Sequence, residues 1–198
     1  MNKAELEKIK IKAIEDKIPI IMDDSLDVIA KILREVKPKR MLEIGAAVGY
    51  SAMCFSMYLE KDGKIDTIER DPVRCIEARE NITRAGLDNI INLYEGDAVE
   101  ILPTINEKYD VVFIDAAKGK YPFFLEQALK KLNNGGVILA DNVLYKGYVM
   151  SDYNKHKQRT AVRNLREYLK EVTENKDLET QVLDIGDGLA ISKLKMEK

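Results

Sequence analysis

The residues best suited to chemistry lie directly after two apolar runs of the sequence. Asp115 ends one run and is followed by Lys118, whereas Asp141 and Asn142 follow the other. Continuous apolar runs are typical of buried strands in a parallel sheet, and ligands bind at the carboxyl ends of such strands. We therefore expect these four side chains to lie together at one edge of a sheet.

Three of these side chains offer hard oxygen ligands. Two carboxylates at neighbouring strand ends repel each other unless a cation neutralises them or one of them is protonated. Asp115, Asp141 and Asn142 would fill three positions around a metal ion and leave positions for two substrate oxygens and water. That ligand set suits Mg²⁺, with Mn²⁺ as the alternative ion. The competing interpretation is that both aspartates are N-caps of the helices that follow.

The lysine provides a candidate base. A lysine that accepts a proton must first lose its own, which a nearby divalent cation favours, and the same cation acidifies a bound hydroxyl. Lys118 and Asp115 are therefore the predicted catalytic residues. The alternative is that Lys118 is one of the solvated lysines that every protein surface carries.

A glycine turn supplies a second candidate site. The pattern Glu43-x-Gly45-x-x-x-Gly49 follows a predicted strand, and the next predicted strand ends at Glu69. Glycines let a ligand approach the backbone, and an acid at the tip of the next strand can hold a ribose diol. The spacing is not Gly-x-Gly-x-x-Gly, which fits a pyrophosphate. It favours a nucleoside ligand such as S-adenosylmethionine, although a tight turn and a solvated strand end would look the same.

Strand and helix patterns alternate along the chain. The predicted strands cover 40–45, 64–69, 90–94, 109–115, 136–141, 179–185 and 188–194. The predicted helices cover 3–16, 24–36 (capped by Asp24 or Ser25), 49–60, 72–85, 97–102, 120–132 and 158–173. This order predicts an α/β fold with a doubly wound, mostly parallel seven-stranded sheet, closed by a C-terminal antiparallel hairpin. We expect one domain over 1–198, with N-terminal helices at 1–37 and a Rossmann-like core at 38–198. Residues 142–157 are expected to form a loop that covers the substrate.

Composition excludes several classes of protein. The net charge of −2 gives no global sign of nucleic-acid binding, and no apolar run reaches membrane-spanning length. The N-terminus lacks an apolar signal segment. Cys54 and Cys75 have neither metal nor redox spacing, so we expect buried, reduced thiols and a cytoplasmic location.

The motifs, taken in order, resemble those of the metal-dependent catechol-type O-methyltransferases over about residues 19 to 195. They are Leu-Glu-Ile-Gly (42–45), Gly-Tyr-Ser (49–51), Thr-Ile-Glu-Arg (67–70), Gly-Asp-Ala (96–98), Phe-Ile-Asp-Ala-Ala-Lys (113–118) and Ala-Asp-Asn-Val (140–143). The resemblance implies an enzyme with the class I methyltransferase fold that transfers methyl from S-adenosylmethionine to a metal-chelated hydroxyl, as a homodimer. It implies these cofactor-binding residues: Met22, Glu43, Gly45, Tyr50, Ser51, Glu69, Asp97, Ala98 and Asp115. From the residues alone, Asp97 is most simply a helix N-cap, which does not exclude a place in the adenine pocket.

Three stretches narrow the resemblance to one branch. Residues 115–121, 141–147 and 186–192 resemble most closely the bacterial tRNA 5-hydroxyuridine methyltransferases, which produce 5-methoxyuridine at the wobble position. Two adjacent oxygens are needed to chelate and react, and both catechols and 5-hydroxyuridine offer them. The site therefore leaves two acceptors open, the tRNA anticodon loop and a small catechol-like molecule.

A basic stretch bears on that choice. Its cations are Lys155, Lys157, Arg159, Arg163 and Arg166. The three arginines share one face of the predicted helix, so we expect them to contact anticodon phosphates. Lys120, Lys146, Tyr121 and Tyr145 could extend this surface, with a tyrosine stacking the target base. The alternative is a solvated amphipathic helix.

Overall fold

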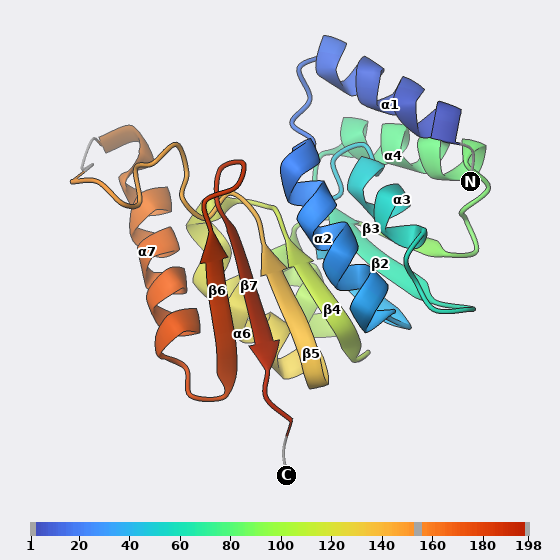
Figure 1. The fold of residues 1–198 in the computed structure, drawn as a ribbon. Helices are drawn as coiled ribbons and strands as arrows, with labels where there is room; N and C mark the ends of the chain where they lie inside the picture. Colours follow the sequence, from blue (N-terminus) through green and yellow to red (C-terminus); the bar gives the residue numbers. More distant parts are fainter. Residues whose placement is uncertain (1–2, 153–155, 197–198) are drawn as a thin grey trace. The chain divides into compact units, whose positions relative to one another are not determined.

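The computed structural model describes residues 3–152 and 156–196 and divides the chain into two compact units, Met1–Ile105 and Asn106–Lys198. The strands follow the order β3-β2-β1-β4-β5-β7-β6. Within the second unit, Figure 1 shows β7 between β5 and β6. The predicted fold class, a mostly parallel seven-stranded sheet with helices, is confirmed. The prediction of a single domain stays a prediction.

The first unit contains three parallel strands and most of the helices. Its elements are α1 (Lys3–Glu15), α2 (Asp23–Val36), β1 (Arg40–Ile44), α3 (Tyr50–Ser56), β2 (Lys64–Glu69), α4 (Pro72–Arg84), β3 (Ile91–Glu95), α5 (Ala98–Ile101) and the 3₁₀ turn η1 (Leu102–Thr104). β2 pairs in parallel with both β1 and β3, so its residues Ile65–Ile68 are buried. The parallel pairing brings the carboxyl ends of β1 and β2 to one edge.

Local chemistry explains where α4 begins. The carboxylate of Asp71 accepts hydrogen bonds from the backbone N–H groups of Val73 (2.9 Å) and Arg74 (3.3 Å), and Pro72 follows it, as is usual at a helix start. The expected N-cap of α2 was wrong. Met22 occupies the N-cap, and Asp24 instead accepts a hydrogen bond from the N–H of Ser25 inside the first turn.

The second unit carries the remaining strands. Its elements are β4 (Tyr109–Ile114), the 3₁₀ turn η2 (Lys118–Lys120), α6 (Tyr121–Lys131), β5 (Leu132–Ala140), the 3₁₀ turn η3 (His156–Gln158), α7 (Arg159–Glu174), β6 (Leu178–Leu183) and β7 (Leu189–Leu194). β4 and β5 are parallel, and β7 runs antiparallel to both β5 and β6. The C-terminal hairpin therefore adds one antiparallel strand, as expected.

An aromatic contact joins the two long helices of this unit. The rings of Tyr121 on α6 and Tyr168 on α7 are 5.5 Å apart and nearly perpendicular, at 81°. Both side chains are fully buried. Leu165 and Val172 lie on the same buried face of α7, which packs α7 against its unit as the amphipathic pattern predicts.

β5 is longer than expected. It begins at Leu132, although Asn133-Asn134-Gly135-Gly136 is typical of a turn. The register against β4 shifts between the Tyr109–Leu132 and Val111–Val137 pairs, so residues 133–136 form an irregularity within the strand. Asn133 donates a hydrogen bond of 2.7 Å from there to the carboxylate of Asp110. A sequence pattern cannot show such a cross-strand anchor.

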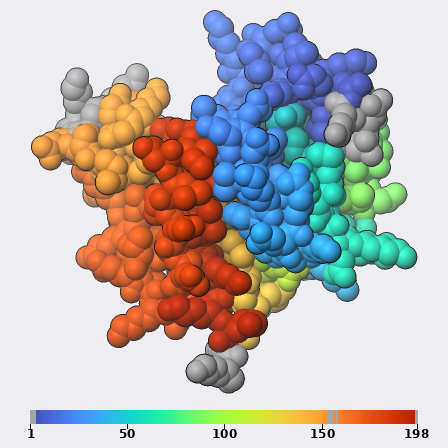
Figure 2. Space-filling model, viewed as in Figure 1, coloured from blue at the N-terminus to red at the C-terminus, as the bar shows by residue number. Residues whose placement is uncertain are grey.

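Two further expectations concern the chain as a whole. Cys54 and Cys75 are buried and unpaired, so the prediction of buried free thiols is confirmed. Among the described residues, no helix combines the length and the apolar character that crossing a membrane requires. Figure 2 shows the outer side of α2, in blue, as part of the exposed surface of the first unit.

Candidate active site

Two hydrogen bonds connect the three proposed metal ligands. The Asn142 side-chain Nδ2 donates to Oδ1 of Asp115 at 2.8 Å, and the Asn142 backbone N–H donates to Oδ1 of Asp141 at 2.9 Å. The second unit therefore brings together the residues that follow β4 and β5, as the sequence pattern predicts.

The backbone around these residues is held in an unusual conformation. Asn142 has a left-handed φ of 60°, which asparagine tolerates better than most residues. The buried hydroxyl of Tyr121 donates a hydrogen bond of 2.7 Å to the main-chain carbonyl of Asp141 and lies 3.4 Å from that of Ile114. One phenol thus contacts the ends of both strands. It cannot stack a substrate base, so that part of the predicted RNA surface was wrong for Tyr121.

The electrostatics of the cluster disfavour an isolated charge on Asp115. Burial raises the pKa of the Asp115 carboxyl above its usual value, and the charge of Lys118 and the hydrogen bond from Asn142 offset part of that rise. The Lys118 ammonium lies 5.7 Å from the centre of the Tyr145 ring. A buried carboxylate with a raised pKa gains from a neighbouring cation.

The donor set fits a hard divalent cation. Neither aspartate caps a helix, because Lys120 occupies the N-cap position of α6 and no helix begins within several residues of Asp141. Over the described residues, no group of three or more histidine, cysteine, aspartate or glutamate side chains is placed to hold a metal. A site here would therefore depend on two carboxylates plus the amide oxygen of Asn142, which a half-turn of the amide group exchanges with its nitrogen.

In the first unit, Glu43 is fully enclosed by its own fold. Its Oε1 accepts a hydrogen bond of 2.5 Å from the Ser51 hydroxyl, and its Oε2 accepts one from Thr67. Glu43 therefore fastens α3 and β2 to β1. Sequence reasoning gave Thr67 no role, although its place in a strand that was expected to be buried was a usable sign.

Glu69 fastens the glycine turn to the end of β2. Its Oε2 accepts the N–H of Ala47 at 2.8 Å, and its Oε1 accepts the N–H groups of Arg70 and Asp71, both at 2.9 Å. Gly45 and Gly49 have positive φ values of 104° and 80°. Their backbone conformations explain why glycine occupies both positions.

The other predicted cofactor residues, except Asp115, lie in the same unit. Asp97 is the N-cap of α5 and accepts the N–H of Val99 at 2.8 Å, while Ala98 is buried in the first turn. Tyr50 is buried, which raises the pKa of its phenol, and Met22 is 51% exposed. No cofactor contact of these residues has been tested, so their roles stay predictions.

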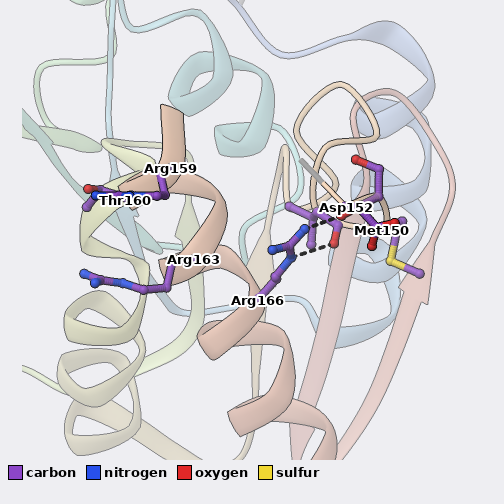
Figure 3. A pocket seen from close by; sticks show the side chains of 8 residues that line it. Met150, Asp152, Arg159, Thr160, Arg163 and Arg166 are labelled. Carbon is purple, nitrogen blue, oxygen red and sulfur yellow. Dashed lines mark hydrogen bonds between the residues drawn. The ribbon is translucent and has the colours of Figure 1, made fainter. Parts of the chain in front are cut away.

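The side chains of the three arginines of α7 do not all point the same way. Arg166 turns toward the segment that carries Met150 and Asp152, whereas Arg159 and Arg163 point the other way (Figure 3). The guanidinium of Arg166 donates to the carbonyl oxygens of Val149 (2.9 Å), Tyr148 (3.1 Å) and Ser151. The guanidinium of Arg166 therefore binds main-chain carbonyls of residues 148–151.

A cavity of about 650 Å³ lies beside these side chains. Its lining residues are Val149, Met150, Ser151, Asp152, Arg159, Thr160, Arg163 and Arg166. The side chains of Arg159 and Arg163 are exposed. Lys155 and the Lys157 side chain, which were also part of the predicted basic stretch, lie outside the described residues.

Known proteins share both the sequence pattern and the fold. The model of the family described as O-methyltransferase matches residues 2–195. A catechol O-methyltransferase from Niastella koreensis is 32% identical over 166 residues, which cover 79% of this chain and 74% of that protein. A caffeoyl-CoA O-methyltransferase from Populus kitakamiensis is 30% identical, over 83% of this chain and 74% of that protein.

A solved structure gives the same picture. An O-methyltransferase from Bacillus cereus in complex with SAH superposes with a TM-score of 0.88 at 25% identity, covering 98% of this chain and 92% of that one. The expected resemblance to O-methyltransferases is confirmed. The narrower resemblance to tRNA-modifying enzymes stays a prediction.

Proposed function

The chain belongs to the O-methyltransferase family, and on that premise we propose that it transfers methyl from S-adenosylmethionine to a hydroxyl of a small catechol-like acceptor. The observation that carries an acceptor with two adjacent oxygens is the hydrogen-bonded cluster of Asp115, Asp141 and Asn142. Two carboxylates and an amide oxygen suit a hard cation, and such a cation can be chelated by two adjacent oxygens of an acceptor. The similarity to a catechol O-methyltransferase supports the same class of acceptor.

The proposed site residues divide between two tasks. In the first unit, the glycine turn at Gly45 and Gly49 and the carboxylate of Glu69 would bind the nucleoside part of the cofactor. In the second unit, Asp115, Asp141 and Asn142 would hold Mg²⁺ or Mn²⁺. Such a cation would lower the pKa of a chelated acceptor hydroxyl and orient it.

The reaction itself is a displacement at carbon. The neutral amine of Lys118 accepts the proton of the acceptor hydroxyl, and an oxygen lone pair forms a bond to the sulfonium methyl carbon as the carbon–sulfur bond breaks. The products are the methyl ether, S-adenosylhomocysteine and protonated Lys118. Holding the acceptor in line and excluding water would supply most of the rate enhancement.

A comparison of acceptors tests the chelation. Catechol and phenol differ by one hydroxyl, so methyl transfer to each is measured with S-adenosylmethionine and Mg²⁺. We expect turnover of catechol and little of phenol, since phenol cannot offer two oxygens. Equal turnover of the two would contradict a chelated acceptor.

The second candidate acceptor is 5-hydroxyuridine at the wobble position of tRNA, and the exposed arginines Arg159 and Arg163 favour it. Both line the cavity beside α7, where they could meet phosphates. Replacing both with alanine should then raise KM for tRNA and flatten its salt dependence by roughly one log–log unit per lost phosphate contact. Unchanged tRNA kinetics would leave the arginines as a solvated surface.

A further inference from the structure

The residues after Asp141 form a strained segment. We call residues 142–151 the tyrosine segment, because Tyr145 and Tyr148 lie in it. Tyr145, Lys146 and Gly147 have consecutive left-handed φ values of 45°, 57° and 71°. Such conformations are strained for a non-glycine residue and persist only where the surroundings impose them.

The hairpin turn between β6 and β7 holds the first part of the tyrosine segment in place. The carbonyl of Gly188 accepts the N–H of Val143 at 3.0 Å, and that of Asp187 accepts the N–H of Leu144 at 2.9 Å. The Asp187 side chain accepts the N–H of Lys146. Gly188 has a φ of 92°, and a Cβ there would lie 2.4 Å from Cγ of Leu144, so only glycine fits.

Arg166 holds the second part of the tyrosine segment in place. Its planar guanidinium reaches three carbonyl oxygens in the tyrosine segment, two of them at 2.9 and 3.1 Å. A lysine keeps the charge but has no planar fork to distribute among several acceptors. The shape of the side chain is therefore as important here as its charge.

An aromatic pair connects the part of the segment that Arg166 binds to the proposed base, Lys118. The rings of Tyr145 and Tyr148 meet edge to face with centres 5.9 Å apart at 90°. Tyr148 offers its carbonyl to Arg166, and the Tyr145 ring faces the Lys118 ammonium at 5.7 Å. A continuous line of contacts thus runs from Arg166 through both tyrosines to Lys118.

We propose that Arg166 is a positioning residue for methyl transfer: it holds the tyrosine segment so that Tyr145 stays against Lys118 at the acceptor site. The proposal rests on the proposed function of Lys118 and its neighbours. It assigns Arg166 to the architecture of the active site, where the sequence pattern grouped it with Arg159 and Arg163.

A kinetic comparison tests the role of the guanidinium. Arg166→Ala should lower kcat/KM for catechol about 10- to 100-fold, the scale of a small misplacement of catalytic groups, and leave S-adenosylhomocysteine affinity unchanged. Arg166→Lys should restore little of the loss. Lys170→Ala is the matched control, because it removes an exposed cation one turn further along α7 and should alter kcat/KM less than about twofold.

A fluorescence measurement reads the segment without any reaction. The chain has no tryptophan, so Tyr145→Trp introduces a single reporter. In that background, Arg166→Ala should shift the emission to the red and increase acrylamide quenching, whereas Lys170→Ala should do neither. Because no acceptor is needed, this result stands even if catechol is not the substrate.

The two readouts together decide the proposal. Unchanged fluorescence in Arg166→Ala would overturn it, whatever the kinetics show. Full recovery by Arg166→Lys would also overturn it, because charge alone would then suffice. A fall in activity matched by an equal fall in S-adenosylhomocysteine affinity would indicate general unfolding and would overturn it as well.

Discussion

The phenol of Tyr121 donates a hydrogen bond of 2.7 Å to the main-chain carbonyl of Asp141, and the centres of the Tyr121 and Tyr168 rings are 5.5 Å apart. Both tyrosines are buried, but they differ in the hydrogen bonding of their hydroxyl groups. Among the described residues, the hydroxyl of Tyr168 has no hydrogen-bond partner. A buried hydroxyl without a partner lowers stability, whereas one that is bonded does not.

This difference predicts opposite effects of the same substitution. Tyr121→Phe should lower the free energy of unfolding by about 1 kcal/mol and reduce turnover, since the end of β5 loses its anchor. Tyr168→Phe should leave the free energy unchanged or raise it by up to about 1 kcal/mol. Urea denaturation of both variants measures this, and an equal loss in the two would show that the Tyr168 hydroxyl has a partner.

The strand ends could be predicted from sequence because apolar runs and the residues after them are local patterns. Asp115, Asp141 and Asn142 were placed together on that basis, and their hydrogen bonds agree with it. What the pattern could not show is which contacts hold them there. The bond from Tyr121 to Asp141 joins residues 20 apart in the chain, and no periodicity signals it.

The α7 arginines show the opposite limit. A helical repeat correctly placed Arg159, Arg163 and Arg166 on one helix, but it assigned them one role. The carbonyl acceptors of Arg166 belong to a segment without regular structure, 15 to 18 residues earlier in the chain. Helical periodicity predicts the face of the helix from which a side chain projects, but not the groups that the side chain contacts.

The buried carboxylate of Glu43 leads to a prediction about the stability of the first unit. Glu43→Ala would leave the hydroxyls of Ser51 and Thr67 without their acceptor, so the free energy of unfolding should fall by about 2–4 kcal/mol. Ser51→Ala is the control that removes one of the two donors, and it should cost less. Urea denaturation without ligand separates this effect from cofactor binding, and an unchanged midpoint for Glu43→Ala would contradict a structural role.

Glu69 gives the matching prediction about affinity. Glu69→Ala releases the N–H of Ala47 in the glycine turn and removes the proposed ribose contact. The affinity for S-adenosylhomocysteine should fall by about 1–3 kcal/mol, as expected for a lost bond to a charged group. Calorimetric titration measures it, with NAD as a ligand that should not bind. Binding of NAD but not of S-adenosylhomocysteine would contradict the cofactor assignment.

Lys118 can be tested as the proton acceptor. Lys118→Ala should lower kcat for catechol by about 10²- to 10⁴-fold, the range for a general base, without altering S-adenosylhomocysteine affinity. Lys120→Ala is the nearby control, because Lys120 lies two residues away and is exposed. A loss below tenfold would mean that acidification of the hydroxyl by a cation suffices.

Metal removal tests the ligand cluster. Asp141→Ala should abolish turnover and retain cofactor binding, because Asp141 is proposed to hold the cation and not the cofactor. In the wild type, EDTA should stop turnover, and Mg²⁺ or Mn²⁺ added in excess should restore it. Full activity after chelation and exhaustive dialysis would refute a metal-dependent mechanism.

The most direct measurement is transfer of a labelled methyl group from S-adenosylmethionine, with Mg²⁺, to catechol and to hydroxyuridine-containing tRNA in parallel. Catechol should be labelled on one oxygen, and its labelling should disappear in Asp141→Ala. Labelled tRNA with unlabelled catechol would contradict the small-molecule acceptor. Labelling of neither acceptor, with S-adenosylhomocysteine still bound, would contradict the vicinal-oxygen site itself.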